Sequence, residues 1–204
     1  MTGGTQPFPE DTMTTAAVPT LAARLWPRTA ANSIPRALVL ILAGSVLLAA
    51  SAHVKVPFWP VPMTMQTFVV LMIGAGYGWR LGGATLIAYL VEGAAGLPVF
   101  TGGAGPLYMM GPTGGYLVGF VLAAALTGWL AERGAMRSLV WAVAAFVLAD
   151  AIALALGVGW LSSLIGIDKA IAGGLLPFLP AEALKIVLAT ALTLATSATP
   201  SKKR

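Results

Sequence analysis

The chain contains no cysteine, one histidine and few charged residues. Only 9% of its 204 residues are charged, whereas soluble domains average roughly 25%. The lack of cysteine excludes disulfides, iron–sulfur clusters and a thiol nucleophile. The lone histidine, His53, excludes a multi-histidine metal centre. We therefore expect no metal site and interpret His53 as an interfacial loop residue.

Motifs that would support catalysis are also absent. The glycine-rich residues 102–105 lack the Lys and Ser/Thr that complete a phosphate-binding loop, so the chain carries no P-loop of its own. It has no G-x-S-x-G nucleophile elbow and no carboxylate cluster suited to two metal ions. We predict that the protein is not an enzyme and uses no cofactor. A membrane enzyme or a structural scaffold is the competing interpretation.

Apolar side chains are what the chain has in abundance, since they make up 58% of its residues. They form nearly continuous runs between residues 34 and 199, which an aqueous core of this size cannot accommodate. We predict one all-α integral membrane domain over residues 34–199, with the lipid bilayer as its surroundings. A polar tail over residues 1–33 precedes this domain, and a basic tail over residues 200–204 follows it.

The net charge of +5 does not indicate nucleic-acid binding. The positive residues lie in short connectors and tails rather than on one face, which is typical of membrane topology signals.

A membrane-spanning helix needs roughly 20 mostly apolar residues. Six stretches qualify, the second being short and separated from the third by a tight turn near Trp79. They cover residues 35–52, 64–79, 81–99, 112–131, 139–161 and 176–197. If both termini lie in the cytoplasm, Lys55 and Lys169 are the only basic residues of the connectors and tails that fall on the outer side. Five spans would put the C-terminal Lys-Lys-Arg outside, so we predict six.

The three outer connectors of this topology, residues 53–63, 98–111 and 162–175, are rich in glycine, proline and aromatic residues. Irregular backbone at membrane depth is tolerated where it lines a cavity. The inner connectors carry only basic turns. The pattern predicts a ligand site open to the outside.

Glu182 and Lys185 are the most informative charged residues within the spans. They lie three residues apart and so share one helix face, and Pro180 suits an early helical position. Either the pair only fixes helix packing, or it binds a polar solute, with Lys185 supplying a cation and Glu182 accepting hydrogen bonds. Glu92 either points into the same cavity or caps the glycine-rich loop. For Asp150, which has no basic neighbour in sequence, we expect a packing role or a structural partner.

Four segments, read in order, resemble signature sequences of the BioY family. They run from Ala52 to Thr67, from Tyr89 to Phe100, from Gly111 to Phe120 and from Pro177 to Lys185. The resemblance covers roughly residues 36–195. BioY proteins are the biotin-binding S components of energy-coupling-factor (ECF) transporters. They form a bundle of six helices and capture biotin from the outer face of the membrane.

The resemblance implies a multi-pass protein of a bacterial plasma (inner) membrane with biotin as its ligand. It also implies three partner chains: an ECF transmembrane coupling protein and two cytoplasmic ATPases, which alone would bind ATP. An S component for another small vitamin, or a biotin transporter that acts without the ATPases, is the alternative. The oligomeric state, including a homo-oligomer, stays open.

The resemblance also assigns roles to single residues. Lys185 matches the ligand-binding lysine of the family, and Glu182 stands where many members have Asp. Thr101 lies near a position that can carry a ligand-binding Asn. Gln66 and Tyr89 fall within family motifs and complete the candidate substrate-binding set together with Glu92. Ser45 and Ala49 lie where the first helix presents small residues to the coupling protein.

Overall fold

The computed structural model describes residues 20–27, 29 and 33–197. Most of the predicted N-terminal tail, with Arg28, and the predicted basic tail at residues 200–204 lie outside these ranges. The main elements are helices: α1 (Leu21–Leu25), α2 (Ser33–His53), α3 (Gln66–Tyr77), α4 (Trp79–Ala94), α5 (Pro106–Met109), α6 (Gly114–Glu132), α7 (Leu139–Ile165), α8 (Ile167–Gly174) and α9 (Leu179–Ser197). A short 3-10 helix, η1 (Ala135–Arg137), and an antiparallel hairpin of β1 (Lys55–Val56) and β2 (Met63–Thr64) complete the fold.

Four of these helices, α2, α6, α7 and α9, are long and apolar enough to cross a membrane. The fold is therefore that of an all-helical membrane protein, with four candidate spans among the described residues. The predicted second and third spans correspond to α3 and α4, which have 12 and 16 residues. At 1.5 Å per residue they measure about 18 and 24 Å, less than the roughly 30 Å of a hydrocarbon core.

The predicted turn between these two helices is present and lies at Gly78. This residue has φ 83° and ψ 173°, and its N–H donates to the carbonyl oxygen of Gly74 at 3.0 Å. A positive φ of this size strains any residue with a Cβ atom. The short second span in the sequence is thus a helix that ends where glycine permits a reversal.

The predicted connectors hold more regular structure than the sequence pattern indicated. The first contains the β1–β2 hairpin, the second contains α5, and the third contains α8. Two helix ends also differ from expectation. α4 ends at Ala94 instead of residue 99, because Gly96 has φ 98° and Pro98 follows. α7 continues to Ile165, where Gly166 with φ 85° ends it.

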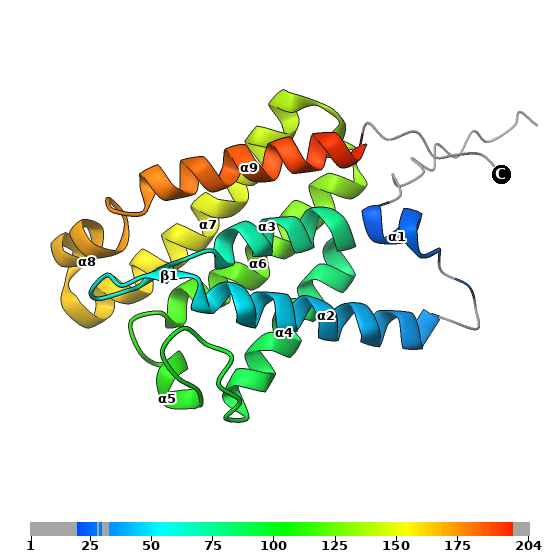
Figure 1. Cartoon of the computed structure of the whole chain (residues 1–204). Coiled ribbons are helices and arrows are strands. Elements are labelled where there is room, and N and C mark those ends of the chain that lie inside the picture. Colours follow the sequence, from blue (N-terminus) through cyan, green and yellow to red (C-terminus); the bar gives the residue numbers. More distant parts are fainter. Residues whose placement is uncertain (1–19, 28, 30–32, 198–204) are drawn as a thin grey trace, which may run out of the picture.

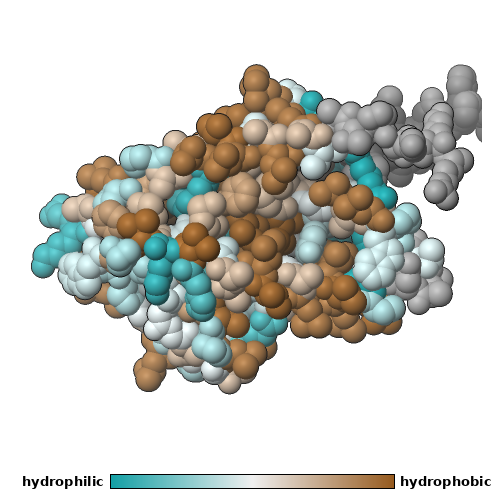
Figure 2. Space-filling model, in the orientation of Figure 1, coloured by the Kyte–Doolittle hydropathy of each residue, from teal (hydrophilic) through white to brown (hydrophobic). Residues whose placement is uncertain are grey.

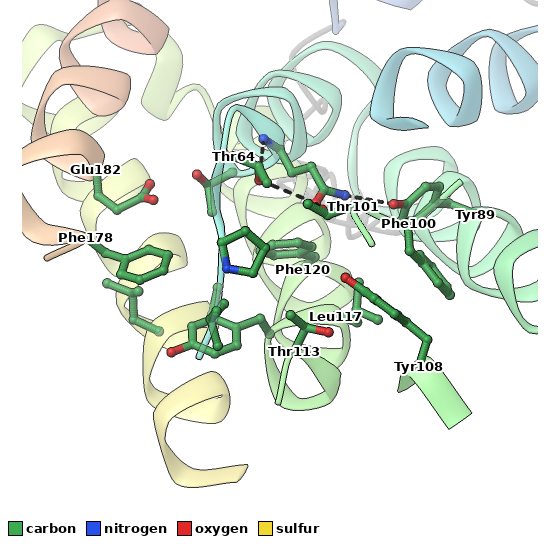
Figure 3. Close-up of a pocket in the computed structure, with 17 residues that line it drawn as sticks. Thr64, Tyr89, Phe100, Thr101, Tyr108, Thr113, Leu117, Phe120, Phe178 and Glu182 are labelled. Carbon is green, nitrogen blue, oxygen red and sulfur yellow. Dashed lines mark hydrogen bonds between the residues drawn. The ribbon is translucent and has the colours of Figure 1, made fainter. Parts of the chain in front are cut away.

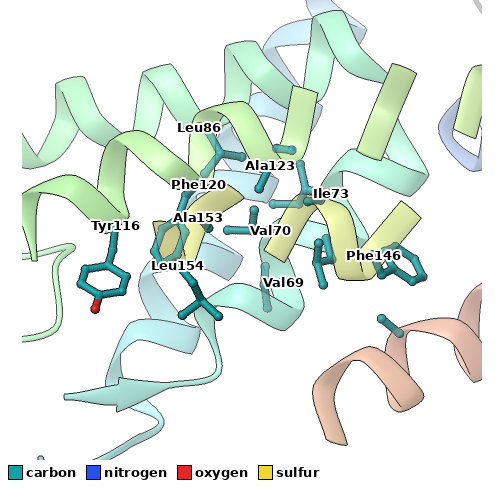
Figure 4. Packing of buried hydrophobic residues seen from close by; sticks show 14 of the residues in the cluster. Val69, Val70, Ile73, Leu86, Tyr116, Phe120, Ala123, Phe146, Ala153 and Leu154 are labelled. Carbon is teal, nitrogen blue, oxygen red and sulfur yellow. The ribbon is translucent and has the colours of Figure 1, made fainter. Parts of the chain in front are cut away.

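Helix α6 occupies the centre of the bundle and packs against α3, α4 and α7 (Figure 1). α9 lies against α3 and α7, and α2 against α3 and α4. Small residues allow these close contacts. A Cβ atom on Gly119 would lie 2.7 Å from the Cα atom of Ala153, so α6 and α7 touch backbone to backbone. Figure 4 shows the side chains of Phe120, Ala153 and Leu154 meeting at this contact.

The elements gather at the two ends of the bundle in different ways. The hairpin, α5 and α8 lie together at one end, here called the cavity end, and α1 lies at the other, here called the basic end (Figure 1). Arg24, Arg80, Arg133 and Arg137 belong to α1, to the α3–α4 turn and to the α6–α7 connection at the basic end.

The surface between the two ends is apolar. Large hydrophobic side chains such as Leu42, Val46, Val147 and Leu188 are about half exposed or more. Figure 2 shows hydrophobic residues across the middle of the face and more hydrophilic residues toward the ends. An exposed apolar zone of this extent fits a lipid environment, where the outside of a bundle needs no polar cover.

Part of the predicted polar tail is folded onto this bundle. Arg36 of α2 is only 4% exposed. Its Nε donates to the carbonyl oxygen of Trp26 at 2.6 Å, and its Nη2 donates to that of Ala22 at 2.8 Å. The guanidinium therefore supplies a donor to the Trp26 carbonyl at the end of α1 and a second donor to the Ala22 carbonyl, which also accepts from the Trp26 N–H at 3.1 Å.

Candidate ligand-binding site

A cavity opens at the cavity end of the bundle, and the empty space among its lining residues is about 540 Å³, part of which is open solvent at the mouth. It is bounded by the hairpin, the segment around α5 and the helices α3, α4, α6, α7 and α9. Its lining consists of Val61, Pro62, Thr64, Gln66, Thr67, Tyr89, Phe100, Thr101, Tyr108, Thr113, Tyr116, Leu117, Phe120, Ala153, Leu154, Phe178 and Glu182 (Figure 3). Four of the six predicted substrate-binding residues, Gln66, Tyr89, Thr101 and Glu182, are in this set.

Gln66 organises one wall of the cavity. It is the first residue of α3, where its N–H donates to Thr64 Oγ1 at 3.2 Å. Its Nε2 donates to the Tyr89 hydroxyl at 2.8 Å, and its Oε1 accepts from Thr101 Oγ1 at 3.2 Å. The Tyr89 hydroxyl in turn donates to the carbonyl oxygen of Val99 at 2.9 Å. This chain of hydrogen bonds holds three predicted site residues in fixed orientations.

The segment that carries Thr101 is held from two sides. Lys55 of β1 donates from Nζ to the carbonyl oxygen of Thr101 at 2.6 Å, which ties the hairpin to this segment. On the other side the Phe100 ring covers Gly93 of α4 so closely that a Cβ atom there would overlap the ring. The fold thus requires glycine at residue 93 to seat Phe100.

Aromatic rings form the apolar part of the wall. Phe100 stacks on Tyr108 with ring centroids 5.1 Å apart and meets Tyr89 edge to face at 5.4 Å. Across the cavity Tyr116 stacks on Phe178 at 6.2 Å, and its hydroxyl donates to the carbonyl oxygen of Gly174 at 2.6 Å. The cavity is therefore faced by rigid, mostly apolar surfaces with polar groups at a few points.

Glu182 supplies the one carboxylate in this lining. Its Oε1 is 2.7 Å from Lys185 Nζ, which also donates to Thr67 Oγ1 at 2.9 Å. Both residues are buried, at 3% and 4% exposed. Glu182 Oε2 has no hydrogen-bond partner, and Figure 3 shows the carboxylate directed toward the cavity. A ligand N–H group would meet a free, strong acceptor here.

Lys185 does not itself line this cavity. Its ammonium lies behind Glu182 and Thr67, both of which do. The structure therefore brings the predicted pair together, with Glu182 in the cavity wall and Lys185 bonded to it from behind the wall.

Glu92, by contrast, does not belong to the cavity lining. Its Oε2 accepts a hydrogen bond from Ser45 Oγ of α2, so its side chain faces α2 rather than the cavity or the glycine-rich loop. Ser45 is consequently buried, and Ala49 is half-buried. The sequence reasoning missed this contact because 47 residues separate the two partners and nothing in either local pattern pairs them.

Several lining residues had not been singled out from the sequence. Thr67, Tyr116 and Phe178 lie inside the very segments that carried the family resemblance, beside the glycine and proline residues that attracted notice. An aromatic ring next to a glycine-rich run in an apolar span is the signal that would have found Tyr116.

Comparison with known proteins agrees with this geometry. A model of the BioY family matches residues 13–201. The biotin transporter BioY of Thermotoga maritima is 38% identical over 159 residues, which are 76% of this chain and 93% of that protein. The biotin transporter BioY of Rhizobium etli is 34% identical over 149 residues, covering 68% and 79% of the two chains.

The fold has a solved counterpart. A crystal structure described as the S-component for biotin from an ECF-type ABC transporter superposes with a TM-score of 0.73 at 22% sequence identity. The match covers 85% of this chain and 97% of the other. With its family model spanning nearly the whole sequence and its bundle shared with this structure, the chain belongs to the BioY family, a family of membrane transport proteins.

Proposed function

We propose that this chain is the biotin-capturing subunit of a vitamin importer, and that biotin occupies the cavity described above. The observation that carries the proposal is Glu182, a buried carboxylate with one free oxygen in an otherwise aromatic and apolar cavity. Relatives named as biotin transporters support the same ligand.

The lining suits the chemistry of biotin, which is a fused ring with urea N–H and C=O groups on an anionic chain. Glu182 Oε2 would accept a urea N–H, and hydrogen bonds to a charged group contribute roughly 1.5–3 kcal/mol each. Gln66, Tyr89 and Thr101 offer donors for oxygen atoms of the ligand. Lys185 would meet the anionic chain by exchanging its bond to Thr67. The rings of Tyr116 and Phe178 would enclose the apolar ring system.

We assign six membrane spans, with α3 and α4 as short spans completed by their connecting segments and both termini in the cytoplasm. The membrane domain covers residues 34–199, between the two tails. Support comes from the arginines at the basic end, which the positive-inside rule places in the cytoplasm. The cavity end then faces outward, as capture at a bacterial plasma membrane requires. Cysteine-labelling of single introduced cysteines in the two ends, from either side of the membrane, tests this orientation.

Energy for import would come from partners, an ECF transmembrane coupling protein and two cytoplasmic ATPases. The sequence supports this division because it lacks a P-loop. Contact with the coupling protein through α2 would rely on exposed small residues such as Ala43 and Ala50, since Ser45 is buried against Glu92 and Ala49 is half-buried. Biotin uptake into vesicles that contain only this chain would show instead that it acts alone.

Titration of biotin into the purified, detergent-solubilised protein tests the proposal, with Lys185→Ala as the site variant. Glu132→Gln is the matched control, because Glu132 lies at the basic end and bonds the Trp79 N–H. We expect tight binding by the wild type and the control, and at least tenfold weaker binding by Lys185→Ala. No binding by the wild type would overturn the ligand assignment, and a competition panel of other small vitamins would then identify the S component's substrate.

A further inference from the structure

One buried charged residue, Asp150, has no role in the site as described so far. It lies in the middle of α7, is 5% exposed and does not line the cavity. Its Oδ1 atom has no hydrogen-bond partner. The charged groups that act on it are Glu182 and Lys185, both from α9. Asp150 therefore forms a buried cluster with the pair that borders the cavity.

Other ionisable groups on the elements packed against α7 are engaged elsewhere. Tyr116 of α6 is bonded to Gly174, and Glu132 of α6 to Trp79. Tyr77 of α3 and Arg137 of η1 belong to the basic end, and Asp168 and Lys169 of α8 are exposed at the cavity end. Within the described part of the chain, the charge balance around Asp150 is thus set by Glu182 and Lys185 alone.

That balance is unfavourable when all three groups are ionised. Two carboxylates and one ammonium leave a net negative charge in an apolar, membrane-embedded setting, where an unpaired charge is costly. Lys185 donates to Glu182 and Thr67, which leaves Asp150 Oδ1 and Glu182 Oε2 without donors. Two carboxylates that share a site do not readily ionise together.

A single proton resolves both difficulties. It makes the cluster neutral and creates one O–H donor for a carboxylate that has a bare oxygen. The ammonium is 2.7 Å from Glu182 Oε1 and so balances the charge of that carboxylate directly. Asp150 has no cation bonded to it, so the proton belongs on Asp150.

We propose that Asp150 is a protonated positioning residue that donates to Glu182 and holds it as the ionised acceptor at the cavity wall. Binding of an anionic ligand is then linked to this proton, because loss of the proton adds a negative charge beside the site. The linkage rests on the proposed function, whereas the protonation of Asp150 does not.

Infrared difference spectroscopy on the purified protein tests the proton without any ligand. The carbonyl stretch of a neutral carboxylic acid should be present in the wild type at neutral pH and lost in Asp150→Asn. A spectrum without this band, or a band that persists in the variant, would overturn the proposal.

Biotin affinity measured from mildly acidic to alkaline pH tests the linkage. Once Asp150 loses its proton, wild-type affinity should fall by about tenfold per pH unit. Asp150→Asn keeps a donor and cannot ionise, so its affinity should stay within threefold of the wild type at neutral pH and not change as Asp150 would titrate. Asp150→Leu, of similar bulk but without a donor, should bind at least tenfold more weakly than Asp150→Asn.

Equal affinities of the Asn and Leu variants, or a wild-type pH profile retained in Asp150→Asn, would refute the positioning role. Thermal unfolding of each purified variant verifies that it is folded. If the wild type binds no biotin at any pH, the proposed function fails while the infrared band still decides the protonation of Asp150.

Discussion

The two ends of the bundle use their polar residues in different ways. At the cavity end, hydrogen bonds join segments that are far apart in sequence: Gln66 to Tyr89, Lys55 to Thr101, and Lys185 to Thr67. At the basic end, polar side chains mostly satisfy backbone groups at helix termini, as Arg36 does for α1 and Glu132 does for the Trp79 N–H.

This difference separates polar groups that stabilise the end of one helix from polar groups that fix several segments relative to one another. A side chain that caps a helix end adds local stability and can be replaced at moderate cost. A buried network across several segments fixes one geometry and leaves an unpaired polar group when any member is lost. Substitutions of the cavity-lining residues in this network should therefore change both stability and ligand affinity, and those at the basic end only stability.

The largest effect is expected from breaking the Glu182–Lys185 pair. Glu182→Ala removes the carboxylate that is bonded to the buried Lys185 ammonium and leaves Thr67 as its hydrogen-bond partner, which should lower the free energy of unfolding by about 3–5 kcal/mol and weaken biotin binding at least tenfold. The double variant Glu182→Leu/Lys185→Met removes both charges and should recover most of the stability without recovering the binding. Thermal unfolding and biotin titration of the wild type and these two variants separate the two roles. A double variant that binds biotin as the wild type does would contradict the site.

The second largest effect is expected at the close contact between α6 and α7. Gly119→Ala forces a methyl group toward the Ala153 backbone, and we expect a loss of about 1–3 kcal/mol from overpacking, measured as a lower unfolding midpoint in detergent. Gly159→Ala on α7 is the matched control, since a Cβ atom there has nothing within 4 Å. It should raise stability by about 0.5–1 kcal/mol. Equal effects of the two substitutions would count against the tight α6–α7 contact.

Gln66→Leu should lower the stability as much as Gly119→Ala or less, and it should clearly weaken biotin binding. It removes the partner of Thr101 Oγ1 and one of the two partners of the Tyr89 hydroxyl, at a cost of about 1–3 kcal/mol. Biotin affinity should fall, because Thr101 and Tyr89 lose their fixed orientations. Gln66→Glu keeps the acceptor for Thr101 and should retain more affinity. Biotin titration of both variants tests this. If Gln66→Glu binds no more tightly than Gln66→Leu, the hydrogen-bond network does not support biotin affinity.

The smallest effect is expected at the basic end. Glu132→Ala removes one acceptor from the partly exposed Trp79 N–H, which should cost about 0.5–1.5 kcal/mol and leave biotin affinity unchanged. A loss of affinity in this variant would show that the two ends of the bundle are coupled.

Local patterns in the sequence predicted several of these features. The spacing of Glu182 and Lys185 placed them on one helix face, and the structure shows them bonded. The sequence near Trp79 predicted the tight turn that the structure places at Gly78, and the resemblance of four segments identified the family, which the family model confirms.

Features that depend on long-range packing were not predictable in this way. Asp150 meets Glu182 because α7 and α9 lie side by side, and Ser45 meets Glu92 because α2 crosses α4. Neither pairing leaves a periodic signal in either segment. The hairpin and α8 were missed because elements of two and eight residues are too short for hydrophobic periodicity to reveal them.

The bond between Lys55 and the carbonyl oxygen of Thr101 has a consequence for the rates of ligand exchange. It ties the hairpin to the segment that carries Thr101, and both segments contribute residues to the cavity lining. We expect the ligand to enter and leave where these two segments separate. Removing this hydrogen bond, as in Lys55→Met, would raise the rate constants of ligand association and dissociation alike and leave the affinity, which is their ratio, nearly unchanged. Lys55 would then set the residence time of the ligand rather than its affinity. This matters because a capture protein must release its ligand as well as bind it.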